Sequence, residues 1–310
     1  MKIGILGAGS WGTALTVLLS DNGHDITVWS VDEKEIEMLD TKREHLTKLP
    51  GVKLPDSVRF TTDEQEVCKD AELLVMVVPS PFIRSTAKRV APYITEAQTI
   101  VNVSKGIEDE SLKTLTEVIH EEIPQCKVGV LSGPSHAEEV GKRMPTTVVA
   151  GAKDEKTALM IQDAFMNDYF RVYASPDVIG IELGGALKNV IALAAGVGDG
   201  LGCGDNAKAA IITRGIAEII RLGTAMGGKL ETFAGLSGIG DLIVTCESKH
   251  SRNRKAGFLM DRVRPIRKQW MKYRWLLRAC ILQRQLTNSA RNMVWRCRSC
   301  RSSIGCCLRI

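Results

Sequence analysis

The beginning of the chain, "KIGILGAGSWGTALTVLLSDNGHDITVW", constrains its fold more than any other stretch. It predicts a strand at Lys2–Leu6, a glycine turn, a helix at Trp11–Leu19 and a second strand at Asp25–Trp29. The turn has the spacing G-x-G-x-x-G. Between a strand and a helix, that spacing is typical of a dinucleotide-binding loop.

Each glycine of the turn has a mechanical role. Gly7 permits the tight turn, Gly9 lets a pyrophosphate approach the backbone, and Gly12 lets the helix pack closely on the strand. Asp32 lies at about the ~20-residue offset expected of an acid that binds the cofactor ribose. The alternative, a glycine-rich structural turn, would not require that acid.

Strand and helix patterns then alternate along the first half of the chain. Further strands are predicted at Glu72–Pro79, Thr99–Gly106, Lys127–Pro134, Thr146–Gly151 and Phe170–Ser175, and helices at Ser111–Glu122 and Lys156–Phe165. This order indicates an α/β fold with a Rossmann-like, doubly wound, mainly parallel sheet. Lys105 and Ser135 follow strand ends, where such folds bind ligands.

After Ser175 the strand patterns stop, which predicts a second, all-helical domain. "VIGIELGGALKNVIALAAGVGDGLG" is apolar, and Lys188 is its one basic residue. Burial of an unpaired ammonium is costly and lowers a lysine's pKa, which suits a proton donor to a carbonyl oxygen. The alternative is a lysine that snorkels from a helix surface, and this stretch alone leaves both readings open.

Two later clusters carry polar groups that could bind a ligand. "GLSGIGDLIVTC" contains Asp241 and Thr245 after a glycine-rich turn, and the alternative role for the aspartate is a helix N-cap. "SKHSRNRKAG" contains Ser251, Arg252 and Asn253, which together suit a phosphate group. A solvated basic turn is the alternative there.

The 310 residues, 44% of them hydrophobic, suffice for two domains of ~100–150 residues. No apolar run reaches the ~20 residues of a membrane span, and the N-terminus lacks a signal pattern, so we expect a cytoplasmic protein with reduced thiols. The charge is uneven. Residues 261–310 have 13 Lys and Arg against one Asp, a net +12, while residues 1–260 have 28 basic and 35 acidic residues, a net −7.

Residues 1–260 resemble the bacterial NAD(P)-dependent glycerol-3-phosphate dehydrogenase family in motif order and spacing. The motifs are "GAGSWGTAL", "VSKGIE", "LSGPSHAEEV", "ELGGALKNVIALAAG", "GDNAKAA", "TRG", "GLSGIGDLIVTC" and "HSRNR". The resemblance implies a cytosolic enzyme, a homodimer, that interconverts dihydroxyacetone phosphate and sn-glycerol 3-phosphate with NAD(H) or NADP(H) and feeds glycerophospholipid synthesis. No nucleic-acid or membrane partner is implied.

The resemblance also implies roles for particular residues. Lys188 is the general acid and base. The implied substrate-binding residues are Lys105, Gly133, Ser135, Asp241, Ser251, Arg252 and Asn253. The implied cofactor-binding residues are Gly7, Gly9, Ser10, Trp11, Gly12, Asp32, Lys105, Ala137 and Arg252. The choice between NADH and NADPH stays open, because Asp32 would repel a 2′-phosphate whereas the nearby Lys34 would attract it.

The tail departs from the family, which continues with a "VVEG" segment and a "YGVEMP"-like stretch that this chain lacks. A shift of reading frame accounts for the difference. The codons CAR TGG ATG AAR for "QWMK", read from the third base, give Met or Val followed by Asp-Glu, and permitted codons for "YRWLLRAC" then restore "VVEG". We therefore expect a dinucleotide-binding domain at 1–177, a helical substrate domain at 178–260 and an aberrant, frameshifted tail at 261–310, in which "CRSC" is no metal site.

Two other functions are compatible with a corrupted tail. The first is an NAD(P)-binding protein that is catalytically impaired, because part of the second domain is altered. The second is a nucleic-acid binder that uses the basic tail, whose affinity would depend steeply on salt. Tight cofactor binding without turnover would distinguish the first from an active dehydrogenase.

Overall fold

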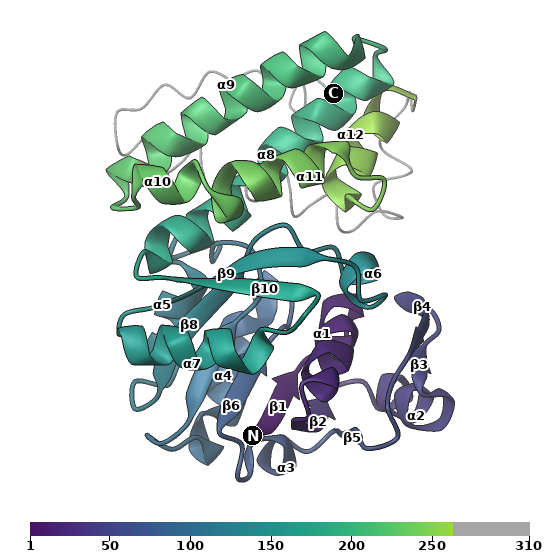
Figure 1. Ribbon diagram of the computed structural model, residues 1–310, viewed down its shortest axis with the longest axis vertical. Coiled ribbons are helices and arrows are strands. Elements are labelled where there is room, and N and C mark those ends of the chain that lie inside the picture. The colour runs from purple at the N-terminus through teal and green to yellow at the C-terminus, as the bar shows by residue number, and fades with distance from the viewer. Residues whose placement is uncertain (263–310) are drawn as a thin grey trace. The chain divides into compact units, whose positions relative to one another are not determined.

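The structure is a computed structural model that describes residues 1–262, and these form two compact units (Figure 1). The first unit contains residues 1–105 and 113–178. The second unit contains residues 106–112 and the described residues from 179 onward. Almost all of the tail expected at 261–310, "CRSC" included, lies outside the described residues.

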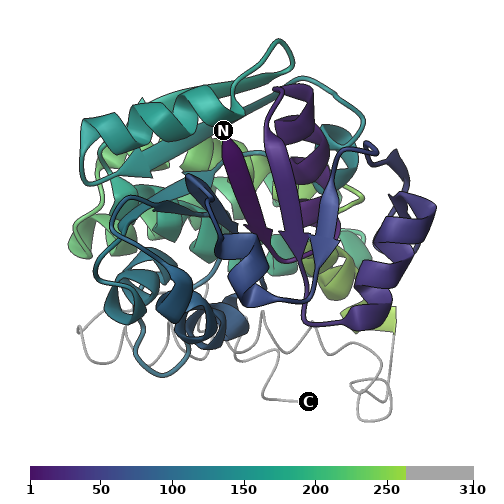
Figure 2. The same ribbon diagram turned by 90° about the horizontal axis from the view of Figure 1, so that it is seen from below.

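An eight-stranded sheet forms the centre of the first unit. Its strands are β1 (Lys2–Leu6), β2 (Asp25–Trp29), β5 (Arg59–Thr61), β6 (Leu73–Met76), β7 (Thr99–Asn102), β8 (Lys127–Ser132), β9 (Thr146–Ala152) and β10 (Phe170–Ser175). They lie in the order β10-β9-β8-β7-β6-β1-β2-β5. Every neighbouring pair is parallel except β8 with β9, so the predicted mainly parallel sheet is confirmed. Figure 2 shows β1 and β2 running side by side.

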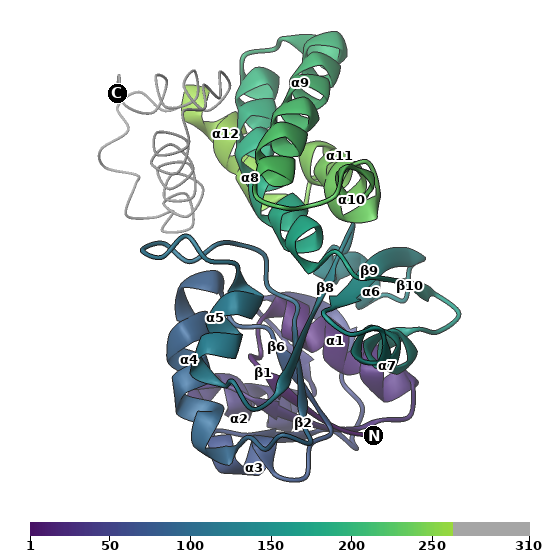
Figure 3. The ribbon, with the colours of Figure 1, turned by 90° about the vertical axis from the view of Figure 1, so that its left-hand side faces the viewer.

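Helices cover both faces of this sheet, as the alternating pattern predicts. They are α1 (Ser10–Asp21), α2 (Glu33–Lys42), α3 (Glu64–Cys68), α4 (Ile83–Val90), α5 (Leu115–Glu122), α6 (Ala137–Val140) and α7 (Glu155–Phe165), with 3-10 turns η1 (Ser80–Phe82) and η2 (Ala91–Tyr93). Figure 3 shows α4 and α5 on one face and α1 and α7 on the other. Accordingly, Leu18 and Phe165 belong to one buried apolar cluster and Ile83 and Ile119 to another.

The starts of several helices follow from capping residues in the sequence. Aspartates at 32, 63 and 154 cap α2, α3 and α7. Thr114 and Glu117 form a capping box at the start of α5. The helix predicted from Ser111 therefore begins only at Leu115. The preceding Leu112 has a φ of 59° and belongs to the second unit.

A short antiparallel hairpin extends from the first unit after α2. It consists of β3 (Glu44–His45) and β4 (Leu49–Lys53) and was not predicted from the sequence. His45 is 1% exposed and Leu49 is buried in the apolar cluster that also contains Leu18. The hairpin is therefore packed on the unit and brings the side chains of residues 45–48 toward α2.

From residue 179 onward, the described part of the second unit forms helices and no strands, as expected, and the added segment 106–112 is not helical. Its helices are α8 (Val178–Gly200), α9 (Gly204–Ala225), α10 (Leu230–Phe233), α11 (Asp241–Glu247) and α12 (Arg252–Arg262), and a π-helical turn, η3 (Leu236–Gly240), precedes α11. Leu183, Leu187, Ile191, Phe233 and Leu242 form the centre of its core. The unit buries an apolar α8 among shorter helices.

Among the described residues, α8 is the one helix with the length and hydropathy of a membrane span. However, 78% of its most apolar window is buried inside the protein. Burial on most sides also explains why α8 shows no clear amphipathic pattern, because a helix enclosed by its neighbours can be apolar all round. This agrees with the helical domain predicted after Ser175.

Candidate active site

The loop between β1 and α1 has the geometry that its three glycines predict. Gly7 has a φ of 127°, and a Cβ atom there would lie 3.1 Å from the Val77 backbone. A Cβ atom on Gly12 would lie 2.0 Å from the Gly7 carbonyl oxygen. Gly9 instead faces open space within 4 Å. The loop is thus tightly packed at Gly7 and Gly12 and open at Gly9, where a pyrophosphate would need room.

The start of α1 suits an anion. Ser10 and Trp11 open the helix, whose first turn contains no acidic residue. The unpaired backbone N–H groups and the helix dipole favour negative charge at such an end. Thr13 donates its hydroxyl hydrogen to the carbonyl oxygens of Gly9 (3.0 Å) and Ala8 (3.3 Å), which fixes the loop from within. These residues fit a dinucleotide phosphate.

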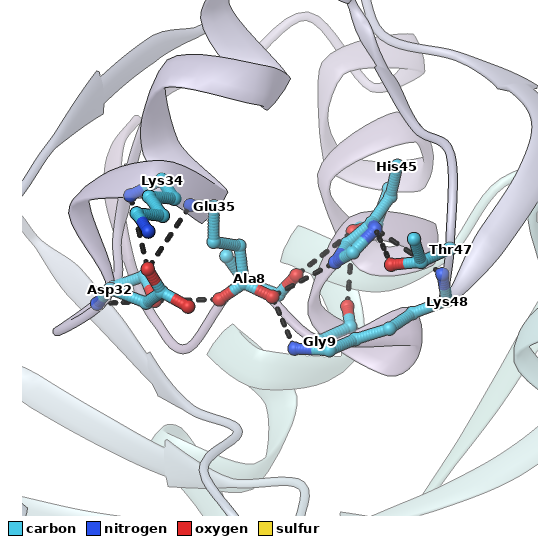
Figure 4. Close-up of polar contacts among 10 residues, drawn as sticks. Ala8, Gly9, Asp32, Lys34, Glu35, His45, Thr47 and Lys48 are labelled. Carbon is cyan, nitrogen blue, oxygen red and sulfur yellow. Dashed lines mark hydrogen bonds and ion pairs between the residues drawn. The ribbon is translucent and has the colours of Figure 1, made fainter.

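Asp32 has a structural role in addition to the one expected of it. Its Oδ1 accepts hydrogen bonds from the backbone N–H groups of Lys34 (3.0 Å) and Glu35 (3.4 Å), so it is the N-cap of α2 (Figure 4). The segment lies beside the glycine loop, since the N–H of Gly7 bonds to the carbonyl of Trp29 at the end of β2 (2.9 Å). The acid therefore lies near the glycine loop, and one of its oxygens is engaged by the helix.

A second carboxylate at this end of β2, that of Glu35, was not anticipated. Its Oε2 accepts from the Ser30 hydroxyl (2.6 Å), and its Oε1 accepts from His45 Nε2 (2.9 Å) and from Lys48 Nζ (Figure 4). His45 Nδ1 accepts the backbone N–H of Lys48 (3.3 Å), so Nε2 carries the hydrogen donated to Glu35.

The partners of Glu35 determine its charge. Burial alone would raise the pKa of Glu35, but hydrogen bonds from His45, Lys48 and Ser30 lower it from 4.5 to about 2. The side chain of Glu35 is 10% exposed and that of Lys48 is 52% exposed. The buried anion of Glu35 is therefore hydrogen-bonded to Ser30 on one side and to the half-exposed cation of Lys48 on the other, close to the expected ribose position. The sequence signal was faint, because Ser30, Glu35 and Lys48 are 5 to 18 positions apart and only Glu35 lies in a helix or strand.

The ends of β7 and β8 bring three predicted residues together. Lys105 Nζ donates to the carbonyl oxygen of Gly133 (2.8 Å), and the Ser135 hydroxyl donates to the same oxygen (2.9 Å). Gly133 has a φ of 149°, and a Cβ atom there would lie 2.9 Å from Val148 Cα. Ala137 is buried at the start of α6. Thus the first unit groups Lys105, Gly133 and Ser135.

The second unit holds Lys188 in a buried polar cluster. Its side chain is 8% exposed, which rules out a lysine that snorkels to solvent. Lys188 Nζ donates to Asp241 Oδ1 and, at 2.7 Å, to Thr245 Oγ1. The expectation of an unpaired ammonium was wrong, because the 1%-exposed Asp241 carboxylate provides the opposite charge. Nor is Asp241 an N-cap, since Gly240 has that position in α11.

Thr245, which the sequence indicated beside Asp241 as a possible ligand-binding group, belongs to this cluster. It lies four residues after Asp241, on the same face of α11, and its hydroxyl donates to the Asp241 carbonyl oxygen (2.6 Å). That donation leaves the oxygen lone pairs of Thr245 to accept from Lys188. The i, i+4 spacing of Asp and Thr in "DLIVT" was the available signal.

Glycine allows the two halves of this cluster to meet. A Cβ atom on Gly184, one turn before Lys188 in α8, would lie 2.3 Å from the Ser237 carbonyl oxygen in η3. A Cβ atom on Gly238 would lie 2.0 Å from the carbonyl oxygen of Phe233. The turn before α11 thus approaches the α8 backbone as closely as atoms permit, and this contact aims Asp241 at Lys188.

The predicted phosphate-binding residues lie at the start of α12. Ser251 is buried, and its Oγ accepts the backbone N–H of Arg254 (3.2 Å). Arg252 is exposed. Asn253 Nδ2 donates to Oδ1 of Asn189, the neighbour of Lys188 in α8 (2.8 Å). The structure therefore joins "SRN" to the lysine segment within the second unit.

Comparison with known proteins identifies relatives of the whole described chain. A family profile described as NAD-dependent glycerol-3-phosphate dehydrogenase N-terminus matches residues 2–158, and the corresponding C-terminus profile matches residues 177–274. The glycerol-3-phosphate dehydrogenase [NAD(P)+] of Agathobacter rectalis is 64% identical over 259 residues, which cover 84% of this chain and 77% of the relative. That of Bacillus subtilis is 53% identical over 264 residues, with coverages of 84% and 76%.

Solved structures of glycerol-3-phosphate dehydrogenases are also similar to this chain. The crystal structure of glycerol-3-phosphate dehydrogenase (gpsA) from Coxiella burnetii superposes with a TM-score of 0.90 at 32% identity, over 96% of this chain and 92% of that one. The yeast glycerol-3-phosphate dehydrogenase GPD1 superposes with a TM-score of 0.81 at 27% identity, over 94% and 90% of the two chains.

The Glu35 cluster predicts a pH-dependent contribution to stability. A pKa lowered to about 2 means that ionised Glu35 stabilises the fold above its unfolded value of 4.5, and that this contribution is lost as the pH falls toward 2. Allowing for the half-exposed Lys48, we expect Glu35→Gln to lower the free energy of unfolding by about 2 kcal/mol at pH 7. Urea unfolding of both proteins at pH 7 and pH 3 measures the difference, which should shrink at pH 3. Glu37→Gln, an exposed position on the same helix, is the control, and a difference that does not change with pH would contradict the assignment.

Proposed function

We infer that the chain, which belongs to the NAD-dependent glycerol-3-phosphate dehydrogenase family, interconverts dihydroxyacetone phosphate and sn-glycerol 3-phosphate with NAD(P)H. It is thus an oxidoreductase, and its product feeds glycerophospholipid synthesis. The observation that carries the assignment within this chain is the buried cluster of Lys188, Asp241 and Thr245. The alternative of a catalytically impaired NAD(P)-binding protein receives no support from the comparisons.

The first unit is proposed to bind the cofactor. The open face of Gly9, the anion-favouring start of α1 and the tight packing at Gly12 support a pyrophosphate there, with Ser10, Trp11 and Ala137 as further contacts. Asp32 is proposed to bind the ribose through the oxygen that does not cap α2. Lys105, Gly133 and Ser135, which the structure groups, are proposed to contact the substrate, and Lys105 the cofactor as well.

The second unit is proposed to provide the proton and the phosphate-binding residues. When bound, the reduced nicotinamide supplies a hydride to the ketone carbon, and negative charge then develops on the carbonyl oxygen. Lys188 delivers a proton to that oxygen, and in the reverse direction it accepts the proton of the alcohol. Asp241 and Thr245 hold Nζ in one place for this transfer. Ser251, Arg252 and Asn253 bind the phosphate, which is remote from the reacting carbon and fixes its orientation.

Several properties of the family remain proposals for this chain. A dimer and a cytoplasmic location are proposed, with no nucleic acid or membrane as a partner. We also propose domain limits of 1–177 and 178–260. In the structure, residues 106–112 belong to the helical unit and not to the first unit.

Substitution of Lys188 tests the catalytic assignment. Lys188→Gln keeps a hydrogen-bond donor for Asp241 and Thr245 but has no proton to transfer at neutral pH. We expect kcat to fall by about 10³-fold, within the range usual for loss of a general acid. NADH oxidation with dihydroxyacetone phosphate measures kcat, and NADH fluorescence should show unchanged cofactor binding. Lys142→Gln, at an exposed lysine, is the matched control. Retention of wild-type kcat in Lys188→Gln would refute the role.

Asp32 offers a way to separate helix capping from cofactor choice. Asn caps helices as well as Asp does but carries no charge, so Asp32→Asn should preserve stability while removing repulsion of a 2′-phosphate. We expect the NADPH-to-NADH ratio of kcat/KM to rise about fivefold, the size of a weak, partly screened charge interaction. Asp32→Ala should raise the ratio similarly but also lower the melting temperature. A ratio that stays constant in both variants would remove Asp32 from cofactor choice.

We propose that residues 261–310 result from a shifted reading frame. The codons of the tail, when read from the third base, restore family-like segments, and this supports the proposal. The change of net charge at residue 261 supports it as well. Intact-protein mass spectrometry of the enzyme from its source, together with activity measurements on this chain and on a version re-read in the other frame, tests it. The expected result is turnover by the re-read version and the mass of that version in the source. Abundant active enzyme with the mass of the present tail would refute the proposal.

A further inference from the structure

The carboxylate of Asp199, near the end of α8, joins three helices of the second unit. Its Oδ2 accepts from Arg254 Nε in α12 at 2.7 Å, and its Oδ1 lies 2.9 Å from Lys208 Nζ in α9. The side chains of Asp199 and Lys208 are 14% and 11% exposed, so little solvent screens the pair. The hydrogen bond to Asp199 raises the pKa of Lys208. Lys208 also lies 3.6 Å from Glu247 of α11.

The helices that Asp199 connects are already in backbone contact. Cβ atoms on Gly196 and Gly257 would lie 2.0 and 2.1 Å from the carbonyl oxygens of Arg254 and Leu193, and one on Gly200 would lie 2.8 Å from that of Phe258. These contacts between glycines and backbone fix how closely α8 and α12 pack. Because glycines carry no side chains that interlock, the contacts do little to prevent one helix from sliding along or rotating against the other. A directional bond between Asp199 and Arg254 resists both.

Arg254 is held at two of its atoms. Its backbone N–H donates to Ser251 Oγ at the start of α12, and its guanidinium donates to Asp199. Because residues two apart on a helix point about 200° apart, Arg252 and Arg254 cannot serve the same ligand from one face. Arg254 is directed at Asp199, and Arg252 is exposed. The two arginines of "SRNR" therefore have different roles, because Arg254 binds Asp199 within the protein and Arg252 is accessible to a ligand.

We propose that Asp199 is a positioning residue for the substrate's phosphate, acting through Arg254 on the first turn of α12. This rests on the proposed function, which assigns Ser251, Arg252 and Asn253 to the phosphate. Asp199 sets the rotation of that turn against α8, and Asn253 is thereby kept on Asn189, next to Lys188. Lys208 holds the other oxygen of the Asp199 carboxylate.

The test compares Asp199→Asn with Glu247→Gln in the full chain. Both variants remove one carboxylate near Lys208, but only the first removes the charge that holds α12. For Asp199→Asn we expect the KM of dihydroxyacetone phosphate to rise about tenfold, equivalent to roughly 1.4 kcal/mol, with kcat changed less than about twofold. The kcat/KM of dihydroxyacetone, which has no phosphate, should stay unchanged. Glu247→Gln should resemble the wild type with both substrates.

Further measurements separate this role from general damage. Asp199→Glu keeps the negative charge and should restore most of the lost affinity. Should Asp199→Asn fail to fold, Arg254→Gln cuts the same bond from the other end and should show the same phosphate-specific loss. Equal losses with both substrates, or no loss at all, would overturn the proposal. Calorimetric titration with glycerol 3-phosphate is the independent readout. Wild-type enzyme that neither turns over nor binds glycerol 3-phosphate, with either version of the tail, would overturn the proposed function, and this inference with it.

Discussion

The buried ion pair between Lys188 and Asp241 is the interaction on which the proposed chemistry of this protein depends. Removing two charges from water costs several kcal/mol per ion, and their attraction recovers that cost only with good geometry and further hydrogen bonds. Thr245 provides one such bond. A well-packed apolar pair would serve stability as well or better, so the presence of the ion pair is best explained by reactivity. In the proposed mechanism, the buried ammonium of Lys188 lies where negative charge develops on the substrate.

Close backbone contacts make that geometry available. The second unit brings Asp241 to Lys188 across 53 residues of chain by pressing the turn before α11 against Gly184. The same device recurs between α8 and α12, where three glycines remove the side chains that would hold the helices apart. In the first unit, Gly7 and Gly12 do the same between strand and helix. Glycine here gives up local stability so that functional groups from distant segments can meet.

The sequence predicted features that depend on local pattern and failed where long-range contacts decide. β1, β2 and β10 have the predicted limits, because apolar runs between turn residues define buried strands. Lys188 was singled out because a charge within an apolar helix is conspicuous. Its pairing with the Asp241 carboxylate was not predicted, because the spacing of residues 188 and 241 in the sequence does not indicate that they are in contact. The Glu35–His45–Lys48 cluster was missed for the same reason. The reversed direction of β9 could not be predicted either, because strand composition does not encode direction.

The π-helical turn η3 makes the length of the chain just before α11 unusually important. A π-turn holds one more residue than an α-helical turn, and such turns are frequent at functional sites. Deleting one residue between 236 and 240 would let the segment relax into an ordinary helix and rotate Asp241 by about 100°. The carboxylate would then leave Lys188, although every side chain of the pair was still present. Length variation should therefore be absent here among active members of the family. The proposed chemistry therefore depends on the number of residues in one turn as well as on their identity.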